Sequence, residues 1–338
     1  MCVFHIERMC SMCVTPRSKP IIPKLLFLFQ GLLAYLINYF GVFTYMDPEG
    51  GSNVSTPPIK KENYMKIMTL NTHSWLEEEP QEKLKQIAQK ICHEQYDVIA
   101  LQEVNQTMDA KRLTSEQLKN FSQVQEQTPV RSDNFAYCLI QLLAEQGETY
   151  YWSWEMSHIG YAIYEEGNAL LSKQPLTSQT HLVSETKEKE DYHTRKILVG
   201  QTSVKTQCIT VASCHFSWWA DEKSGFAFEW KELEASLAPL TTPLYLLGDF
   251  NNPAEGSGYD LVAKSQLPIR DAYPIAQKKQ AEATIEKRID GWENNKEGLR
   301  IDYIYVPQDC FVTSYQRIFD GENGPIVSDH YGVAVTLE

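Results

Sequence analysis

Residues 96–104 read YDVIALQEV, and this stretch decides how the rest of the chain is expected to fold. Its apolar run is nearly continuous, which is typical of a strand buried on both faces inside a sheet that helices cover. The run ends in Gln102 and Glu103 rather than in turn residues. Because a carboxylate is costly to bury unless it is ionised, paired or metal-bound, the end of this strand is a candidate for chemistry.

Strands and helices alternate on both sides of this stretch, without an internal repeat. Apolar residues recur at helical spacing in 82–94, whereas residues 106–132 are polar and predict a loop. Hairpins and helices both connect the strands, so we expect an α/β fold of mixed sheets with helices outside. The expected helices are 82–94, 136–145 and 225–237; the expected strands are 66–71, 96–104, 150–155, 169–171, 196–203, 208–215, 242–247, 301–306, 312–318 and 332–337.

The charge of the chain argues against a nucleic-acid binder. The 338 residues have a formal net charge of −13, and residues 1–64 carry six Lys or Arg against four Asp or Glu, which leaves 25 against 40 for residues 65–338. Nucleic-acid binding relies on basic surfaces that neutralise phosphates. An acidic body tolerates a small phosphate ester, so we expect a small-molecule partner and no nucleic acid. No oligomeric state is predicted.

The cysteines indicate a reducing compartment. Three of the eight lie in the first 13 residues, where Cys10 and Cys13 have the spacing of half a metal or redox site without a second pair. The other five are scattered singly through apolar runs, an odd number without the spacing of a disulfide framework. We therefore expect reduced thiols and a cytoplasmic protein.

The first 64 residues form a hydrophobic leader and linker with two interpretations. Residues 25–46 carry no charge and are long enough for a membrane-spanning helix, which needs about 20 residues. Basic residues precede this segment, as in a signal anchor that would tether the body to the membrane. At Met65, however, the sequence changes in character to MKIMTLN (65–71), which is typical of a protein that starts with its first strand. We expect the working protein to start at Met65, with residues 65–338 as a soluble catalytic domain and no membrane contact.

Polar side chains sit where the apolar strands end. Such residues usually serve in turns, but six strand ends with this property predict that the side chains meet in one cleft. Oxygen donors of this kind suit Mg²⁺, or alternatively Mn²⁺, and His can contact a phosphate and move protons. The strand-end residues are Asn71, Gln102, Glu103, His215, Asp249, Asn251, Asp302, Asp329 and His330.

Seven short motifs in a fixed order resemble the endonuclease/exonuclease/phosphatase superfamily. The resemblance spans residues 66–338 and implies a four-layer, DNase I-like sandwich of two mixed sheets flanked by helices. Each motif alone is weak, and their order carries the resemblance. The motifs are Leu-Asn (70–71), Leu-Gln-Glu (101–103), Gly-Asn-Ala-Leu-Leu-Ser (167–172), Ser-Cys-His-Phe (213–216), Gly-Asp-Phe-Asn (248–251), Arg-Ile-Asp-Tyr-Ile (300–304) and Ser-Asp-His (328–330).

The resemblance also implies a role for each strand-end residue. Glu103 is implied as the principal Mg²⁺ ligand, with help from Asn71 and Asp329. Asp249 is implied to orient or deprotonate the attacking water, and Asn251 to hold that water or the phosphate. His330 is implied to contact the phosphate with its ring fixed by Asp302, and His215 to be a second such histidine. Some nucleases of the superfamily carry an acidic residue where this chain has His73, which argues against a second carboxylate-bound metal.

Further motifs resemble the superfamily branch of bacterial maltose 6'-phosphate phosphatases. That resemblance implies a phosphomonoesterase that releases phosphate from a disaccharide phosphate. Trp218 and Trp219, together with His193 and Arg195, are candidate substrate-binding residues, because indole faces can pack on sugar rings and cations can hold a phosphate. Core packing is the competing interpretation for every Trp, including the further candidates at positions 75, 152 and 154. The motifs are LNTHSW (70–75), YYWSW (150–154), HIGY (158–161), DYHTR (191–195) and CHFSWW (214–219).

Three alternatives remain open on the sequence. A genuine leader would favour an extracytoplasmic phosphodiesterase such as a sphingomyelinase-like enzyme. A local basic groove would favour a nuclease despite the acidic total. A non-enzymatic scaffold would require that the strand-end residues do not converge.

Overall fold

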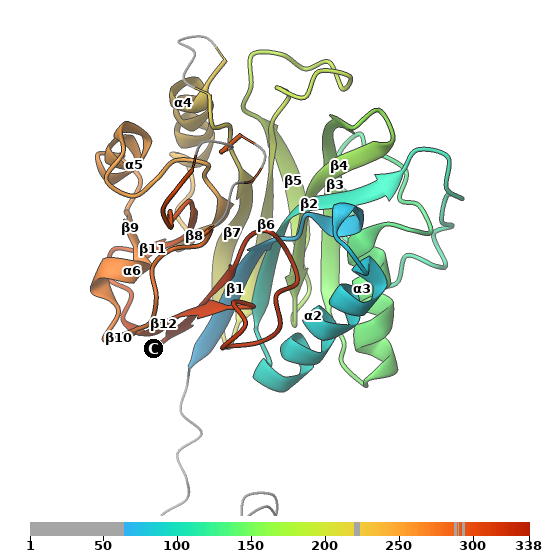
Figure 1. Cartoon of the computed structure of the whole chain (residues 1–338), viewed down its shortest axis with the longest axis horizontal. Coiled ribbons are helices and arrows are strands. Elements are labelled where there is room, and N and C mark those ends of the chain that lie inside the picture. The colour runs from blue at the N-terminus through green and yellow to red at the C-terminus, as the bar shows by residue number, and fades with distance from the viewer. Residues whose placement is uncertain (1–63, 220–223, 287–288, 290, 293–294) are drawn as a thin grey trace, which may run out of the picture. The chain divides into compact units, whose positions relative to one another are not determined.

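The computed structural model describes residues 64–219, 224–286, 289, 291–292 and 295–338, and within them two mixed β-sheets pack face to face (Figure 1). One sheet has the strand order β10-β12-β13-β1-β2-β4-β3, and the other has the order β5-β6-β7-β8-β11-β9. The strands are β1 (Met65–Asn71), β2 (Val98–Thr107), β3 (Tyr151–Gly160), β4 (Tyr164–Ser172), β5 (Thr177–Leu182), β6 (Lys196–Val204), β7 (Gln207–His215), β8 (Leu244–Asp249), β9 (Ile269–Asp271), β10 (Lys278–Lys279), β11 (Asp302–Pro307), β12 (Val312–Ile318) and β13 (Gly332–Leu337).

Helices cover the outer face of each sheet. Helices α2 and α3 lie against the first sheet, while α4 and α5 lie on the side of the second sheet (Figure 1). The order is therefore helices, sheet, sheet, helices, and the expected four-layer α/β sandwich is confirmed. The helices are η1 (Ser74–Leu76), α2 (Pro80–Glu94), α3 (Phe135–Glu145), α4 (Phe226–Leu237), α5 (Ser257–Ala263) and α6 (Ala272–Ile275).

The continuous apolar run in β2 follows from its position inside this sandwich. Val98 and Ala100 point into the core between the two sheets, whereas Ile99 and Leu101 point to the core beneath α2 and α3. Successive side chains of a strand face opposite sides, so a strand covered on both faces needs apolar residues at every position. The predicted apolar face of α2 completes the outer core, with Leu84, Ile87, Ala88 and Ile91 all buried.

Six short elements were not predicted, among them the three-residue helix η1, and each lacks a strong periodic signal. Strand β5 reads TSQTHL and lies at the edge of its sheet, where its side chains are only partly covered. Strands β9 and β10 have three and two residues, and helices α5 and α6 have seven and four. Elements of this length offer too few positions for an apolar pattern to emerge.

The hydrophobic segment 25–46 and the rest of the leader up to residue 63 lie outside the described residues. Within the described part of the chain, no helix has both the length and the apolar character needed to cross a membrane. The five cysteines beyond Met65 are free thiols.

Gly248 lets β8 approach β7 closely, one residue before Asp249. Its φ is +145°, and a Cβ at this position would lie 1.9 Å from the carbonyl oxygen of Cys214. The close approach is part of the register that sets His215 opposite Asp249. Only glycine combines this backbone conformation with the missing side chain.

We expect Gly248→Ala to lower the free energy of unfolding by more than about 3 kcal/mol, because it adds a backbone clash to the conformational strain. Gly147→Ala is the matched control, since Gly147 also has a positive φ of +85° but nothing within 4 Å of the added Cβ. The control is expected to cost about 1 kcal/mol. Urea unfolding of both variants measures the difference, and equal midpoints would contradict the packing argument.

Glu229 in α4 fixes the loop that follows β7. Its buried carboxylate accepts a hydrogen bond from the Ser217 amide at 2.9 Å and another from the Ser217 hydroxyl. Burial raises the pKa of Glu229 from 4.5 to about 7, although Arg195 and Ser217 act in the opposite direction. The folded protein therefore binds a proton that the unfolded chain releases between these two pH values.

This proton uptake predicts a pH dependence of stability. Because the folded pKa is raised, the stabilisation is present below about pH 4.5 and is lost as the pH rises through about 7, up to about 3 kcal/mol in total. Glu229→Gln removes this titration, so its free energy of unfolding relative to wild type should improve over that range. Urea unfolding at a series of pH values tests this, and parallel curves for the two proteins would refute it.

Candidate active site

Sheet register brings the polar strand ends together at one end of the sandwich. The parallel pair β1 and β2 sets Asn71 opposite Gln102, and the parallel pair β7 and β8 sets His215 opposite Asp249. Strand β11 runs antiparallel to β8, so its first residue, Asp302, also lies opposite Asp249. Carboxyl ends of parallel strands share one edge, which is where polar side chains on neighbouring strands meet.

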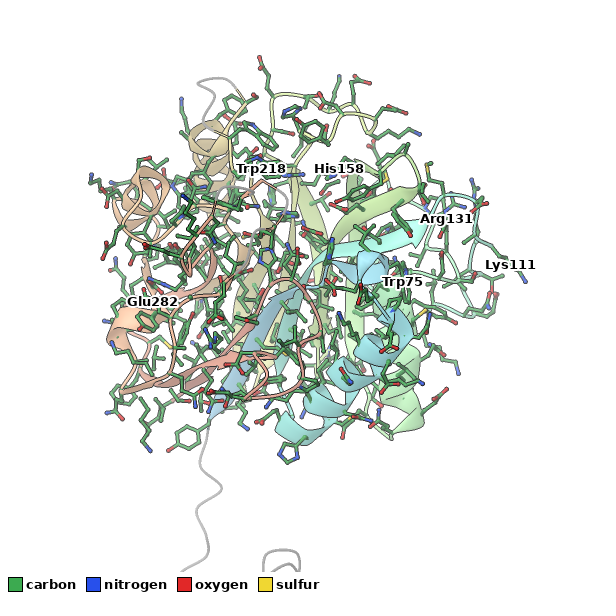
Figure 2. The ribbon with its side chains drawn as sticks, viewed as in Figure 1. Trp75, Lys111, Arg131, His158, Trp218 and Glu282 are labelled. Carbon is green, nitrogen blue, oxygen red and sulfur yellow. The ribbon has the colours of Figure 1, made fainter. Side chains whose placement is uncertain are left out.

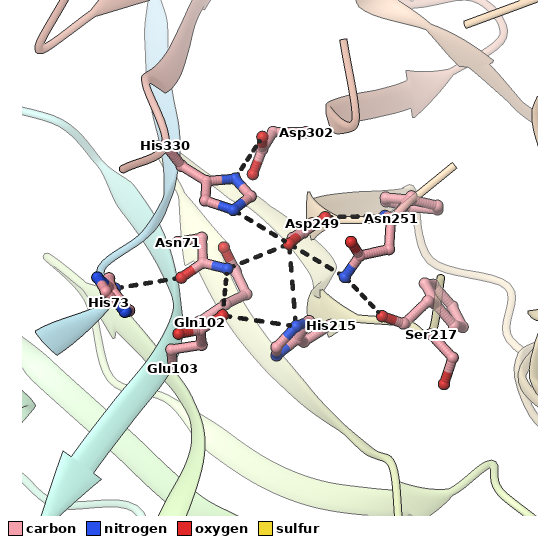
Figure 3. Close-up of polar contacts among 12 residues, drawn as sticks. Asn71, His73, Gln102, Glu103, His215, Ser217, Asp249, Asn251, Asp302 and His330 are labelled. Atoms are coloured by element: carbon pink, nitrogen blue, oxygen red, sulfur yellow. Dashed lines mark hydrogen bonds and ion pairs between the residues drawn. The ribbon is translucent and has the colours of Figure 1, made fainter. Parts of the chain in front are cut away.

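The Asn71 side chain links the two sheets at this end. Its amide donates to Oε1 of Glu103 at 2.8 Å and to Oδ2 of Asp249 at 3.1 Å (Figure 3). Its own oxygen accepts the His73 amide at 3.2 Å. Glu103 belongs to the first sheet and Asp249 to the second, so one buried amide ties a carboxylate from each sheet to a common point.

Glu103 has a strained backbone within β2. Its φ is +51°, and the pairing of β2 with β4 shifts register between Leu101 and Val104, which is the mark of a β-bulge. A non-glycine residue in the left-handed region costs about 1–3 kcal/mol and is often found where it aims a functional side chain. Here the bulge interrupts the regular pairing of β2 with β4 and directs the Glu103 carboxylate to Asn71. Burial and the negative charge of Asp329 raise the pKa of Glu103.

Asp249, His330 and Asp302 form a buried acid–imidazole–acid row (Figure 3). The His330 ring places Nδ1 3.0 Å from Oδ2 of Asp302 and Nε2 3.8 Å from Oδ2 of Asp249. Burial alone would lower the pKa of His330, but the two carboxylates raise it well above 6.5. Burial and the neighbouring Asp302 raise the pKa of Asp249 to about 8.

Asn251 holds Asp249 from the other side. The backbone amide of Asn251 donates to Asp249 Oδ1 at 2.8 Å, and its side-chain amide lies 3.3 Å from Oδ2. The Asn251 side chain also donates to the Phe216 carbonyl at 3.0 Å and accepts the indole N–H of Trp292 at 3.1 Å. Its φ of +50° makes it a second non-glycine residue of this site in the left-handed region.

His215 differs electrostatically from His330. Its Nε2 lies 3.8 Å from Asp249 and 3.9 Å from Glu103. Burial and the nearby Arg195 hold the pKa of His215 well below 6.5, so the ring is neutral at physiological pH. Of the two imidazoles near Asp249, that of His330 is thus charged and that of His215 is neutral, the separation of ionisation states that acid–base chemistry needs.

Asp329 is held by Glu77, an acidic residue that was not predicted from the sequence. Its backbone amide donates to Oε1 of Glu77 at 3.1 Å, and the same oxygen lies 2.7 Å from Nδ1 of His73. Burial would lower the pKa of His73, but Glu77 and Asp329 raise it to about 9. His73, at the position where some nucleases have an acid, is therefore a cation that packs between two carboxylates.

The donor set of the cluster fits a hard divalent cation. The Asn71 amide contacts the carboxylates of Glu103 and Asp249, while Asp302 lies against protonated His330 and Asp329 lies 3.8 Å from protonated His73, so two imidazolium groups offset only part of the charge of four carboxylates. Oδ1 of Asp302 is buried without a hydrogen-bond partner. Excess buried negative charge built from hard oxygens is the condition under which Mg²⁺ or Mn²⁺ binds.

A cleft of about 510 Å³ opens over these residues. Glu103, His215, Asp249, Asn251 and His330 line it together with Arg195 and Trp218. Arg195 is buried, donates from Nη1 to the Tyr192 carbonyl at 3.0 Å, and has no hydrogen-bond partner for its Nε. Its position beside His215 brings a permanent positive charge to the wall of the cleft.

The remaining predicted substrate residues lie behind this wall. His193 places Nδ1 2.7 Å from Asp191, and its ring contacts Trp219, with 4.4 Å between the ring centroids. Trp219 in turn lies 5.3 Å from the Arg195 guanidinium. The expectation that Trp152 and Trp154 face a sugar is wrong, because both are fully buried in the core beneath α3. Trp75 packs on Phe135 in the same core.

Two buried residues of the cleft were not assigned a role from the sequence. Nδ1 of His158 lies 3.2 Å from Arg195 Nη1, and its Nε2 lies 3.4 Å from Glu166. Burial and Arg195 lower the pKa of His158 to about 3, while burial and Glu103 raise that of Glu166 to about 8. His158 belongs to the HIGY motif (158–161), which was quoted for the resemblance but given no role, whereas Glu166 has no sequence signal beyond a polar residue at a buried position of β4.

Comparisons with known proteins agree with this geometry. The model of the Endonuclease/Exonuclease/phosphatase family matches residues 68–330. An endonuclease/exonuclease/phosphatase family protein from Leptotrichia buccalis C-1013-b is 31% identical, with a TM-score of 0.71 over 81% of this chain and 99% of that one. No curated protein matches the sequence.

Two more distant solved structures share the fold. Bacteroides thetaiotaomicron mannosyl-6-phosphatase is 15% identical with a TM-score of 0.55, covering 81% of this chain and 99% of that one. D. rerio TDP2 in complex with single-strand DNA product is 13% identical with a TM-score of 0.55, covering 82% and 100%. With its matching family model and its 31% identical relative, the chain belongs to the endonuclease/exonuclease/phosphatase family, whose members are metal-dependent hydrolases of phosphoester bonds.

Proposed function

We propose that this phosphoesterase is a Mg²⁺-dependent phosphomonoesterase that releases phosphate from a sugar phosphate, with maltose 6'-phosphate as the leading substrate. The observation that carries the proposal is the buried Arg195 guanidinium on the wall of the cleft that holds Glu103, Asp249 and His330. One fixed positive charge amid carboxylates suits a single phosphate group. It does not suit a long polyanion, which needs a row of basic contacts. The sugar phosphatase among the distant structures is compatible with this substrate class.

Glu103, Asn71 and Asp329 would hold the divalent cation. When bound, Mg²⁺ or Mn²⁺ supplies neutralisation of the negative charge that develops on the phosphoryl oxygens. The chain's own contribution is to fix the oxygen donors. The Asn71 amide orients Glu103, and Glu77 positions the backbone of Asp329.

Asp249 is proposed as the group that orients or deprotonates the attacking water. Its pKa of about 8 lies close to physiological pH, which is where a general base is most effective. The two amides of Asn251 and the amide of Asn71 fix the carboxylate through three N–H contacts. Asn251 would in addition hold the water or a phosphate oxygen.

The two histidines would act on the phosphate in different protonation states. Asp302 holds the Nδ1 proton of His330, so Nε2–H points toward the cleft floor and can donate to a phosphoryl oxygen. His215 is neutral and lies between Asp249 and Glu103, where it would contact the phosphate without adding charge. Arg195 would attract the remaining phosphate oxygens through the positive charge that its guanidinium brings to the wall of the cleft.

We further propose that residues 65–338 act as one catalytic domain in the cytoplasm. The five free cysteines of the described chain support a reducing compartment. The alternative of an enzyme anchored through residues 25–46 would place the same site outside the cell, and would favour the sphingomyelinase-like activity.

Replacing Asp249 by Asn, or His330 by Ala, should lower kcat by at least about two orders of magnitude, since each removes a proton-transfer or charge-stabilising group. Asp109→Asn is the control, because it makes the same carboxylate-to-amide change at an exposed position. Steady-state phosphate release from maltose 6'-phosphate with Mg²⁺ measures the loss. Near-normal turnover by either site variant would contradict the role assigned to the replaced residue.

Purified protein with Mg²⁺ should release phosphate from maltose 6'-phosphate and leave plasmid DNA and sphingomyelin intact. Chelation with EDTA should abolish turnover, and either Mg²⁺ or Mn²⁺ should restore it. The three substrates are compared under one buffer and one enzyme concentration. Nicking of DNA or cleavage of sphingomyelin at a comparable rate would replace the phosphomonoesterase by one of the phosphodiesterase alternatives.

A further inference from the structure

Three aromatic side chains stand exposed at the mouth of the cleft. Tyr161 is 54% exposed, Tyr192 is 51% exposed and Trp218 is 37% exposed, and all three line the same cleft as Asp249 and His330. We call Tyr161, Tyr192 and Trp218 the aromatic rim. Figure 2 shows Trp218 and His158 at the same end of the sandwich, away from Trp75.

The rim residues come from three separate segments. Tyr161 lies in the turn between β3 and β4, with a φ of +52°, Tyr192 lies in the loop between β5 and β6, and Trp218 follows β7. Convergence of three exposed aromatic residues from unconnected loops on one opening is not required by the core, which is complete without them. Large apolar groups left at a cleft mouth mark a surface that a ligand covers.

Two of the three rim residues, Tyr192 and Trp218, are held in place from behind. Tyr192 packs on His193 with 4.0 Å between ring centroids, and it meets Trp219 edge to face at 5.9 Å. Trp218 meets Trp219 at 5.0 Å, and a Cβ on Gly291 would lie 2.8 Å from the Trp218 ring. Rigid aromatic side chains bind a ligand at a low entropy cost because few rotamers are lost.

Carboxylates accompany the aromatic rings in the same opening. Glu190 and Glu166 line the cleft beside the rim, together with His158. Apolar faces next to hydrogen-bond acceptors match a pyranose ring, which offers C–H faces and hydroxyl donors. The acidic side chain of Glu190 at this opening would repel a second phosphate, and this disfavours a nucleotide chain.

We propose that the aromatic rim is the subsite for the sugar ring that carries no phosphate, so that Tyr161, Tyr192 and Trp218 determine how strongly a two-ring substrate is favoured over a one-ring substrate. This inference rests on the proposed function and adds a specificity determinant to it. The phosphate end sits on the floor with Arg195, Asp249 and His330, and the ring that carries no phosphate packs on Tyr161, Tyr192 and Trp218. None of the rim residues touches the reacting atoms.

The test is the double variant Tyr161→Ala/Tyr192→Ala, measured with maltose 6'-phosphate, glucose 6-phosphate and glycerol 2-phosphate. The ratio of kcat/KM for the two-ring over the one-ring sugar should fall about tenfold, mainly through KM, while glycerol 2-phosphate stays unchanged. Tyr161→Phe/Tyr192→Phe should keep the ratio because the rings remain. Phe311→Ala, which removes an aromatic residue that is 44% exposed elsewhere, should leave every rate unchanged.

Direct titration with maltose separates this inference from the proposed function. Wild type should bind maltose, and the double Ala variant should bind it about tenfold more weakly, as followed by tryptophan fluorescence. Failure of every sugar phosphate to turn over would remove the proposed function, yet the titration would still test the rim. The rim proposal is overturned if maltose binds both proteins equally, if the variant slows all three substrates alike, or if adenosine 5'-monophosphate is preferred over maltose 6'-phosphate.

Discussion

The structure depends on the hydrogen-bond donors that hold carboxylates side by side where the two sheets meet. Glu103 comes from the first sheet and Asp249 from the second, and the Asn71 amide donates to both. Without such donors the carboxylates would repel one another and draw water between the sheets. Asp302, which lies opposite Asp249 in the register, adds to the negative charge and is itself held by His330. A divalent cation bound by these oxygens would therefore complete the packing of the sandwich as well as supply chemistry.

The electrostatic character of each histidine follows from this arrangement. Both rings lie near two carboxylates, but His330 contacts Asp302 at 3.0 Å and becomes a cation, whereas burial and the charge of Arg195 keep His215 neutral. The two rings come from different strand ends and lie near the same Asp249 oxygen, at 3.8 Å each. The surroundings of each ring, rather than the residue type, therefore decide which imidazole is positively charged and could offer that charge to a phosphate.

The sequence predicts the layers well because the apolar patterns are strong, and it predicts the polar cluster because the strand-end motifs are distinctive. Strand β2 was predicted from its nearly continuous apolar run and helix α2 from the spacing of its apolar residues, and Asn71, Glu103, Asp249, Asp302 and His330 do lie near one another. Glu77, His158 and Glu166 could not be found this way. Glu77 reaches the site because His73 and Ser74 adopt left-handed backbone conformations just before it in the chain. Glu166 contacts His158 where the pairing of β3 with β4 shifts register. Neither feature has a periodic signature.

The floor of the cleft, formed by strand-end residues such as Asp249 and His330, differs in the same way from its mouth, formed by the aromatic rim. Floor residues sit at strand ends whose positions are fixed by sheet register, so a change there disturbs both sheets. Rim residues sit on the β3–β4 turn, the β5–β6 loop and the segment after β7, which can change without altering the register. Loops on a rigid scaffold are where substrate choice is most freely varied. With the phosphoester chemistry assigned to the floor in the proposed function, we expect substrate identity to be encoded in this rim and in the buried Arg195–His158–Glu166 wall beneath it.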